Sequence, residues 1–536
     1  MQMICTLLCY GRFCAQLHLA GAPAAREHRD SHTMEPQQPT APLYKRLAAH
    51  YLDAIRAGTL ARGARMPSLR KLMQLHSISL STAMQLCREL ESAGWLEARD
   101  RSGYFVRTPA RASLAPLNEP ASVAPDPAQY VGIHARVSAF VSNRRNQAVK
   151  VNFSIARAAP ELYPGEALRA AITKGLRQRP ELLTTAPQQR GEAGFRLVVA
   201  RRALAHGMTL APDDILVTNG CIEALNLALR AVASAGDTIA VESPTFYGLL
   251  QVLESLGLRA LEIPTSPQTG ISLEALELAA DTYGDIKAVV VVPHLQNPLG
   301  SCMPDEHKER LVRLCEARDI ALIEDDTYTA LVDSETPLRA IKSWDRSGRV
   351  IHCASLHKIL APGLRLGWMA AGRWQARVEM LKYAQTRNNE SLPQLGAGQF
   401  MSTGAYDRHV RRLRAALAVQ RERTAEGIAR YFPSGTRMNV PPGGLQLWVE
   451  LPEGLSSNWL CEAALAEHIL IAPGPLFSNS NRFDRFLRLN CGWPYTDVVD
   501  SALRRLGEIA TAQLKAQQPR ASGAAALRTS AASALP

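Results

Sequence analysis

From Val151 onward, short apolar runs alternate with amphipathic stretches of helical periodicity, and this alternation constrains the fold more than any other feature. A strand that is apolar on both faces needs cover on both faces, as in a parallel sheet between two layers of helices. We therefore predict an α/β domain with a mostly parallel sheet. The apolar runs expected to be strands are residues 214–218, 238–243, 289–292, 321–323 and 349–354.

Polar or aromatic residues follow the first two of these runs, at the strand ends where open α/β sheets bind ligands. Gly220, Cys221 and Ile222 open a helix, and the free backbone amides of a helix start can cradle a phosphate. Phe246 follows the second run and offers an aromatic face on which a pyridine ring could stack. Each feature alone is equally well explained as turn chemistry.

The next two runs end in residues that suit the same ligand. Asn297 and Tyr328 could hydrogen-bond a phenolic oxygen, and Asp325 could pair with a pyridine nitrogen and keep it protonated. Such a protonated ring acts as an electron sink. The order of these motifs along the chain, rather than any one of them, indicates a site.

The run at 349–354 leads into a loop that contains Ser355, Lys358 and Arg365 and is broken by a proline and a glycine. A lysine in this position can form a Schiff base with an aldehyde cofactor, while the serine and the arginine hold a phosphate of the same molecule. For an isolated S-x-x-K the simpler interpretation is a surface lysine beside a turn.

The full pattern S-x-x-K-x-x-x-P-G-L-R-x-G-W resembles the lysine loop of fold-type I aminotransferases, and the resemblance extends over residues 151–514. It implies pyridoxal 5'-phosphate as the cofactor, Lys358 as the Schiff-base lysine, and a smaller α+β subdomain beside the parallel sheet. It implies that Arg488, in F-L-R-L-N, binds the α-carboxylate of a substrate or effector. The remaining cofactor contacts that it implies are Gly220, Cys221, Ile222, Phe246, Asn297, Asp325, Tyr328, Ser355 and Arg365.

The chain departs from that family in positions near the substrate. Ala156 stands where relatives place a glycine, and Phe246 stands where they usually have a stacking tyrosine. The segment 184–187 lacks the tyrosine that often reaches across the dimer to the cofactor phosphate. Cofactor binding is expected to be intact, whereas fast turnover is not.

Residues 42–108 have a different pattern, which reads helix, helix, turn, helix and β-hairpin. This order is typical of a winged helix-turn-helix. Between Pro42 and Arg107 there are 11 Lys or Arg against 5 Asp or Glu, so this segment carries a surplus of +6 out of the chain's +12. The surplus points to a polyanionic partner.

The same segment resembles the GntR family of regulators through P-S-x-R-x-L at 67–72, I-S-L-S-T at 78–82 and G-Y-F-V at 103–106. The family often has an arginine where this chain has Leu80, which predicts altered base readout there. The alternative is a small helical dimerisation module. The residues that the resemblance assigns to double-stranded DNA are Ser68, Arg70, Ser79, Ser81, Thr82, Arg99 and Arg101.

The remaining segments are expected to lie outside the two domains. Residues 1–41 are predicted to be a disordered leader or a mis-assigned start before Met34, and residues 515–536 a disordered tail. Residues 109–150, rich in Pro and Ala, are predicted to be a flexible linker spanning about 35 Å, with weak helical character at 131–141. The ten scattered cysteines form no metal or disulfide motif, and no apolar stretch suits a membrane, which favours the reducing cytoplasm.

A winged helix-turn-helix joined to an aminotransferase-like domain resembles the MocR subfamily of GntR-type regulators. The resemblance implies a transcription regulator, a head-to-tail homodimer, and a small effector that is an amine, an amino acid or the cofactor itself. Two alternatives remain: an active aminotransferase with an appended DNA-binding domain, and a regulator in which the cofactor is purely structural.

Overall fold

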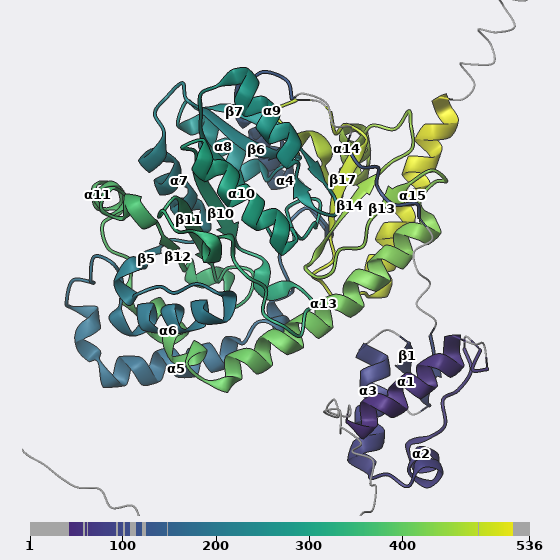
Figure 1. Ribbon diagram of the computed structural model, residues 1–536. Helices are drawn as coiled ribbons and strands as arrows, with labels where there is room; N and C mark the ends of the chain where they lie inside the picture. Colours follow the sequence, from purple (N-terminus) through teal and green to yellow (C-terminus); the bar gives the residue numbers. More distant parts are fainter. Residues whose placement is uncertain are drawn as a thin grey trace, which may run out of the picture.

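The computed structural model describes residues 42–56, 59–61, 63–92, 95–99, 102–107, 114–120, 125–146, 148–480 and 482–517. A small N-terminal part and a much larger α/β part are visible in Figure 1. The expected leader, and the expected tail beyond Gln517, lie outside the described residues. Within the described ranges, no helix has an apolar stretch of the length that crossing a bilayer requires.

A mostly parallel sheet forms the centre of the large part, as predicted. Its strands are β3 (Gln129–Tyr130), β5 (Leu216–Thr218), β6 (Thr238–Ser243), β7 (Arg259–Ser266), β8 (Gly270–Ile271), β9 (Ile286–Val291), β10 (Ala321–Asp326), β11 (Val350–Ser355) and β12 (Gly367–Ala370). The order is β3-β7-β6-β9-β10-β11-β12-β5, with β8 paired to β7. Strands β7, β6, β9, β10 and β11 are parallel, whereas β12 is antiparallel to both neighbours. The polar ends of β6, β9, β10 and β11 therefore meet at one edge of the sheet.

Helices cover both faces of this sheet, which explains why its strands are apolar throughout (Figure 1). One face is packed by α4 (His134–Asn146), α7 (Cys221–Val232), α8 (Tyr247–Ser255) and α11 (Gln375–Gln385). The other is packed by α9 (Leu273–Tyr283) and α10 (Asp305–Ala317). A further layer near β5 contains α5 (Gly165–Gln178), α6 (Ala193–Ala203), α12 (Ser391–Met401) and the first half of α13 (Gly404–Tyr431).

A smaller α+β subdomain follows the 28-residue helix α13, which runs along both subdomains (Figure 1). Its antiparallel sheet has the order β13 (Arg437–Met438), β14 (Gln446–Glu450), β17 (Phe486–Asn490) and β16 (Ala472–Pro473), packed by α14 (Ser457–Ala466) and α15 (Asp497–Gln517). The strand β4 (Val151–Asn152) pairs with β15 (Ile469–Leu470).

Side chains alternate between the two faces of β14 and β17. Leu447, Val449, Leu487 and Leu489 lie in the core of the small subdomain. Trp448 and its cross-strand partner Arg488 lie on the opposite face, which is turned toward the large sheet. This face forms one wall of the cleft between the subdomains.

Part of the stretch expected to be a flexible linker is ordered against the large subdomain. Strand β3 pairs with β7, and the weak helix expected at 131–141 is α4. The backbone amides of Ile133 and His134 both donate to Glu254 Oε2, at 2.8 and 2.7 Å. Because the large subdomain satisfies these backbone groups, a free tether cannot extend over all of residues 109–150.

The N-terminal part has the expected winged helix-turn-helix arrangement. It consists of α1 (Leu43–Arg56), α2 (Leu69–His76), α3 (Leu80–Ser92) and the hairpin of β1 (Leu96–Arg99) and β2 (Gly103–Val106). Ser68 caps α2, with its Oγ accepting from the Lys71 amide at 3.3 Å. Leu72, Leu86 and Leu96 are almost fully buried in a core of its own.

Two ion pairs connect this part to the rest of the same chain. Lys45 Nζ lies 3.2 Å from Glu335 Oε1 at an exposed position, and Arg107 pairs with Glu426 of α13 at a more buried one. Helix α3 lies beside α13. The N-terminal part therefore contacts the helix that also links the two subdomains.

Removing a core side chain should loosen the N-terminal part. Leu86→Ala should lower its local free energy of unfolding by about 2–5 kcal/mol, because it leaves a cavity in a small core. Amide hydrogen exchange of α1 to α3 would measure this value. Leu75→Ala is the matched control, since Leu75 is 57% exposed, and it should change the value by less than about 0.5 kcal/mol. Equal effects of the two changes would contradict the assigned core.

Candidate cofactor site and DNA-binding surface

Lys358 lies on the loop after β11, at the carboxyl edge of the large sheet. The side chain is half-buried, and its Nζ donates to the carbonyl oxygen of Ala156 at 2.5 Å. Desolvation in the cleft, followed by the nearby charges of Arg488 and Arg157, lowers the pKa of the amine to about 7. Much of the amine is therefore unprotonated near neutral pH, and this is its nucleophilic form.

A cradle suited to an anion lies beside this lysine. Gly220 adopts φ +81°, a left-handed conformation that favours glycine, and α7 begins at the next residue. A Cβ placed on Gly220 would lie 3.7 Å from Arg365 Nη2 and 3.9 Å from Ser355 Oγ. The free amides at the start of α7 thus meet a guanidinium and a hydroxyl at one point, which is the donor set that a phosphate requires. The side chain of Ile222 is 38% exposed, so only its backbone amide suits this role.

Asp325 is a buried carboxylate at the end of β10. Its Oδ1 accepts from Thr327 Oγ1 at 2.6 Å and from Cys221 Sγ at 3.1 Å. Burial raises the pKa of this carboxyl, and the two donors oppose the rise. Asp325 is therefore held in one orientation inside the sheet edge, as a partner of a protonated ring nitrogen must be.

The ring-facing residues are also in the cleft. Asn297 Nδ2 donates to Tyr328 Oη at 3.5 Å, and both residues are buried. The ring of Phe246 lies against Gly248, since a Cβ there would come within 2.5 Å of it. Phe246 is half-buried and its ring centroid is 5.0 Å from that of Tyr247. Lysine, anion cradle, buried carboxylate and aromatic face together fit pyridoxal phosphate.

Arg488 is a buried guanidinium without a counter-anion. It is 1% exposed and donates to Asn297 Oδ1 at 2.9 Å and to the Ser154 carbonyl at 2.5 Å. Among the described residues no carboxylate lies within ion-pair distance of it, and its Nε has no hydrogen-bond partner. Burial lowers its pKa. A buried positive charge of this kind is costly unless an anion joins it.

Some residues of the cleft were not identified from the sequence. Thr327 and Ser154 hold Asp325 and Arg488, and Gln446 has a buried amide with no hydrogen-bond partner among the described residues. Gln446 is on the same face of β14 as Trp448, so it lies next to Arg488 across the strand pair. The alternation in Q-L-W-V-E could have indicated Gln446, whereas no local pattern indicates the other two.

Most of the residues predicted to contact DNA lie on α2 or at the start of α3, two helices that contact each other. Arg70 is exposed on α2, and Ser79 is exposed just before α3. Ser79 Oγ hydrogen-bonds Ser81 Oγ at 2.8 Å and Thr82 Oγ1 at 2.9 Å, so these three hydroxyls form one cluster at the start of α3. Leu80 is 51% exposed in the same turn.

Arg99, on the wing, has different surroundings from the residues of α2 and α3. Arg99 lies with its guanidinium 4.4 Å above the ring of Phe105, and it lines a crevice with Arg423 and Arg430 of α13. The predicted residue Arg101 lies outside the described residues. In this arrangement the crevice with α13 surrounds Arg99.

Two family models match the chain in the order seen in the structure. Residues 43–106 match the gntR family of bacterial regulatory proteins, and residues 161–506 match aminotransferase class I and II. The solved multiple-substrate aminotransferase of Thermococcus profundus is 26% identical, with a TM-score of 0.66, over 71% of this chain and 96% of that one. The chain thus joins a GntR-type DNA-binding domain to an aminotransferase-type domain.

Relatives with both domains are also known. The HTH-type transcriptional regulator YdcR of Escherichia coli is 37% identical over 87% of this chain and 98% of its own. TauR of Rhodobacter capsulatus is 28% identical over 83% of this chain and 92% of its own. The chain belongs to the MocR subfamily of GntR-type transcription regulators.

The lowered pKa of Lys358 gives a pH prediction. Attachment of pyridoxal phosphate to the apoprotein, trapped by borohydride after a short pulse, should accelerate as pH rises through about 7. An unperturbed lysine, with a pKa near 10.4, would react mainly at higher pH. Labelling of the exposed Lys174 serves only as the control for attachment outside the cleft. Peptide mass spectrometry would quantify both positions. A midpoint near 10 at Lys358 would contradict the described environment.

The DNA surface gives a second prediction. Arg70→Ala should weaken specific and non-specific duplexes alike and reduce the salt slope by about one charge, because phosphate contacts do not read sequence. Ser81→Ala should change the preference between sequences instead. Binding titrations at several salt concentrations would distinguish the phosphate contact of Arg70 from the base contact of Ser81. Arg169→Ala on α5 is the control for loss of a surface charge. Loss of discrimination in Arg70→Ala with an unchanged salt slope would show that the two roles are exchanged.

Proposed function

We propose that this transcription regulator holds pyridoxal phosphate on Lys358 and senses an amine, an amino acid or the cofactor itself in the cytoplasm. The observation that carries the proposal is Arg488, a buried guanidinium without a counter-anion in the same cleft as Lys358. A ligand with both a carboxylate and an amine would engage the two residues at once. Such a ligand is an amino acid.

Each residue of the cleft has a defined task in this proposal. Pyridoxal phosphate, when bound, supplies a carbonyl that captures amines and a ring that withdraws electrons. Lys358 provides the uncharged amine, and Asp325 holds a proton on the ring nitrogen, oriented by Cys221 and Thr327. Gly220, Cys221, Ile222, Ser355 and Arg365 bind the phosphate, while Phe246, Asn297 and Tyr328 contact the ring.

Regulation requires that the effector bind two arrangements of the linked domains with different affinity. The small subdomain carries Arg488 on β17 and is reached through α13, and α13 also holds the N-terminal part through Glu426 and Arg107. A ligand that draws Arg488 toward Lys358 would shift the small subdomain and with it α13. The DNA-binding part would then be displaced or released.

The second candidate is an active aminotransferase that carries a DNA-binding domain. Its support is the retained set of Lys358, Asp325 and Arg488. Against it stand Ala156, whose carbonyl contacts Lys358 Nζ, and the segment 184–187 without a tyrosine. A third possibility, a purely structural cofactor, does not explain why the buried charge of Arg488 has no anionic partner.

We further propose a head-to-tail homodimer. Leu183, Leu197 and Leu204 are exposed on the segments around α6, and such residues are suited to a subunit interface. The DNA contacts on two N-terminal parts would then read two half-sites of one operator.

A paired experiment separates regulator from enzyme. An amine, an amino acid or the cofactor should change operator affinity by a coupling of about 1–3 kcal/mol, while transamination of the common amino acids stays slow or absent. The coupling should vanish in Lys358→Ala, which should still bind DNA. Turnover of at least ~1 per second, with DNA affinity indifferent to every ligand, would show that the protein is an aminotransferase instead.

A further inference from the structure

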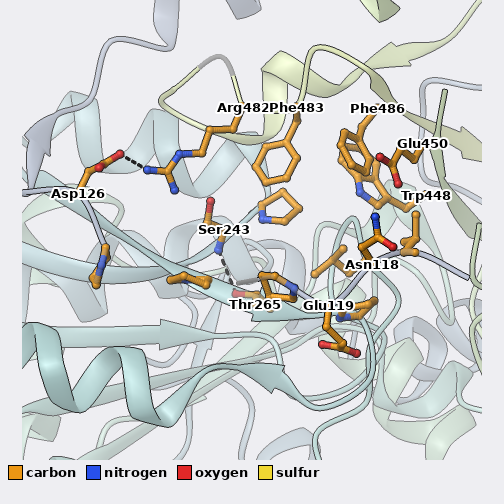
Figure 2. A pocket seen from close by; sticks show the side chains of 17 residues that line it. Asn118, Glu119, Asp126, Ser243, Thr265, Trp448, Glu450, Arg482, Phe483 and Phe486 are labelled. Carbon is orange, nitrogen blue, oxygen red and sulfur yellow. Dashed lines mark hydrogen bonds and ion pairs between the residues drawn. The ribbon is translucent and has the colours of Figure 1, made fainter. Parts of the chain in front are cut away.

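Figure 2 shows a second cavity, of about 500 Å³, and Lys358 is not among the residues that line it. Its walls come from the large subdomain, from the small subdomain and from residues 117–120 and 125–126 of the segment that connects them to the N-terminal part. None of the residues assigned to the cofactor lines it. Its volume is within the range of small-molecule sites.

The walls are mainly apolar and aromatic. Phe483, Phe486 and Trp448 form one side, with Phe486 and Trp448 stacked at 5.5 Å and 15° (Figure 2). The lining also contains several prolines from the large subdomain and the connecting segment, namely Pro120, Pro125, Pro244, Pro264 and Pro267. Rigid walls of this kind suit a compact apolar body.

The charged groups of the cavity are predominantly acidic. Asp126 and Arg482 pair with each other (Figure 2). Glu450 accepts from Arg485 at 3.0 Å through one oxygen, and Glu119 makes no ion pair with any described residue. Carboxylates thus exceed cations around an aromatic wall, a combination that attracts organic cations.

Trp448 is 1% exposed and its Nε1 is enclosed by protein. Phe483 and Phe486 are half-buried and therefore present the open aromatic surface of the cavity. Phe486 is two residues before Arg488 on β17.

We propose that this cavity is a second ligand site, for a compact organic cation. The cationic centre faces the aromatic side chains and Glu119. The ligand joins both subdomains to the connecting segment, and it needs no reaction at Lys358.

Choline is the probe, because a quaternary ammonium cannot add to a carbonyl and therefore cannot report on the cofactor. Its neutral carbon isostere, 3,3-dimethylbutan-1-ol, has the same shape and hydroxyl without the charge. Calorimetric titration of the full-length cofactor-loaded protein at constant ionic strength should show saturable choline binding, at least about fivefold tighter than the alcohol. Lys358→Ala should bind choline equally well.

Variants test the site itself. Glu119→Gln, on an exposed position, and Phe486→Leu should each weaken choline by about threefold or more. Glu453→Gln is the matched control for loss of a carboxylate, because Glu453 is 94% exposed and does not line the cavity. Choline without saturable binding, equal binding of the alcohol, or equal binding in Glu119→Gln and wild type would overturn the proposal.

Discussion

One unpaired charge, the guanidinium of Arg488, dominates the electrostatics of the cleft between the subdomains. Backbone and amide oxygens hold it in place, but among the described residues no carboxylate neutralises it. A buried cation without an anion costs free energy that a merely structural residue would avoid. The same charge also lowers the pKa of Lys358. In the proposed function Arg488 therefore prepares the cleft for an anionic ligand and, together with desolvation, favours the uncharged form of the nearby amine.

The sequence predicted those parts of the fold and site that local patterns determine. The apolar runs gave the parallel strands, and because carboxyl ends of parallel strands meet, residues as distant as Phe246 and Asp325 could be expected in one cleft. The hydrogen bond from Cys221 to Asp325 could not be predicted, because it depends on how α7 docks on β10. The ordered β3 was missed because a Pro- and Ala-rich composition says nothing about pairing with a strand over a hundred residues away.

Helix α13 and the connecting segment physically connect the DNA-binding domain with the two subdomains. The helix packs on the large subdomain, leads into the small one, and bears Glu426, which pairs with Arg107 of the N-terminal part. The connecting segment lines the second cavity and then forms β3 of the large sheet. Both connect the two subdomains with the DNA-binding domain, and we propose that a change in the cleft reaches the DNA-binding domain through them.

The central claim is that Arg488 is kept for ligand binding at the expense of stability. The direct measurement is the free energy of unfolding of the cofactor-loaded protein and of Arg488→Met, with and without the amino acids. Without ligand, Arg488→Met should be as stable as the parent or more stable by about 1–4 kcal/mol, and ligands should stabilise the parent alone. A loss of about 3–5 kcal/mol in Arg488→Met, with ligand stabilisation unchanged, would show that Arg488 is structural and would contradict the account.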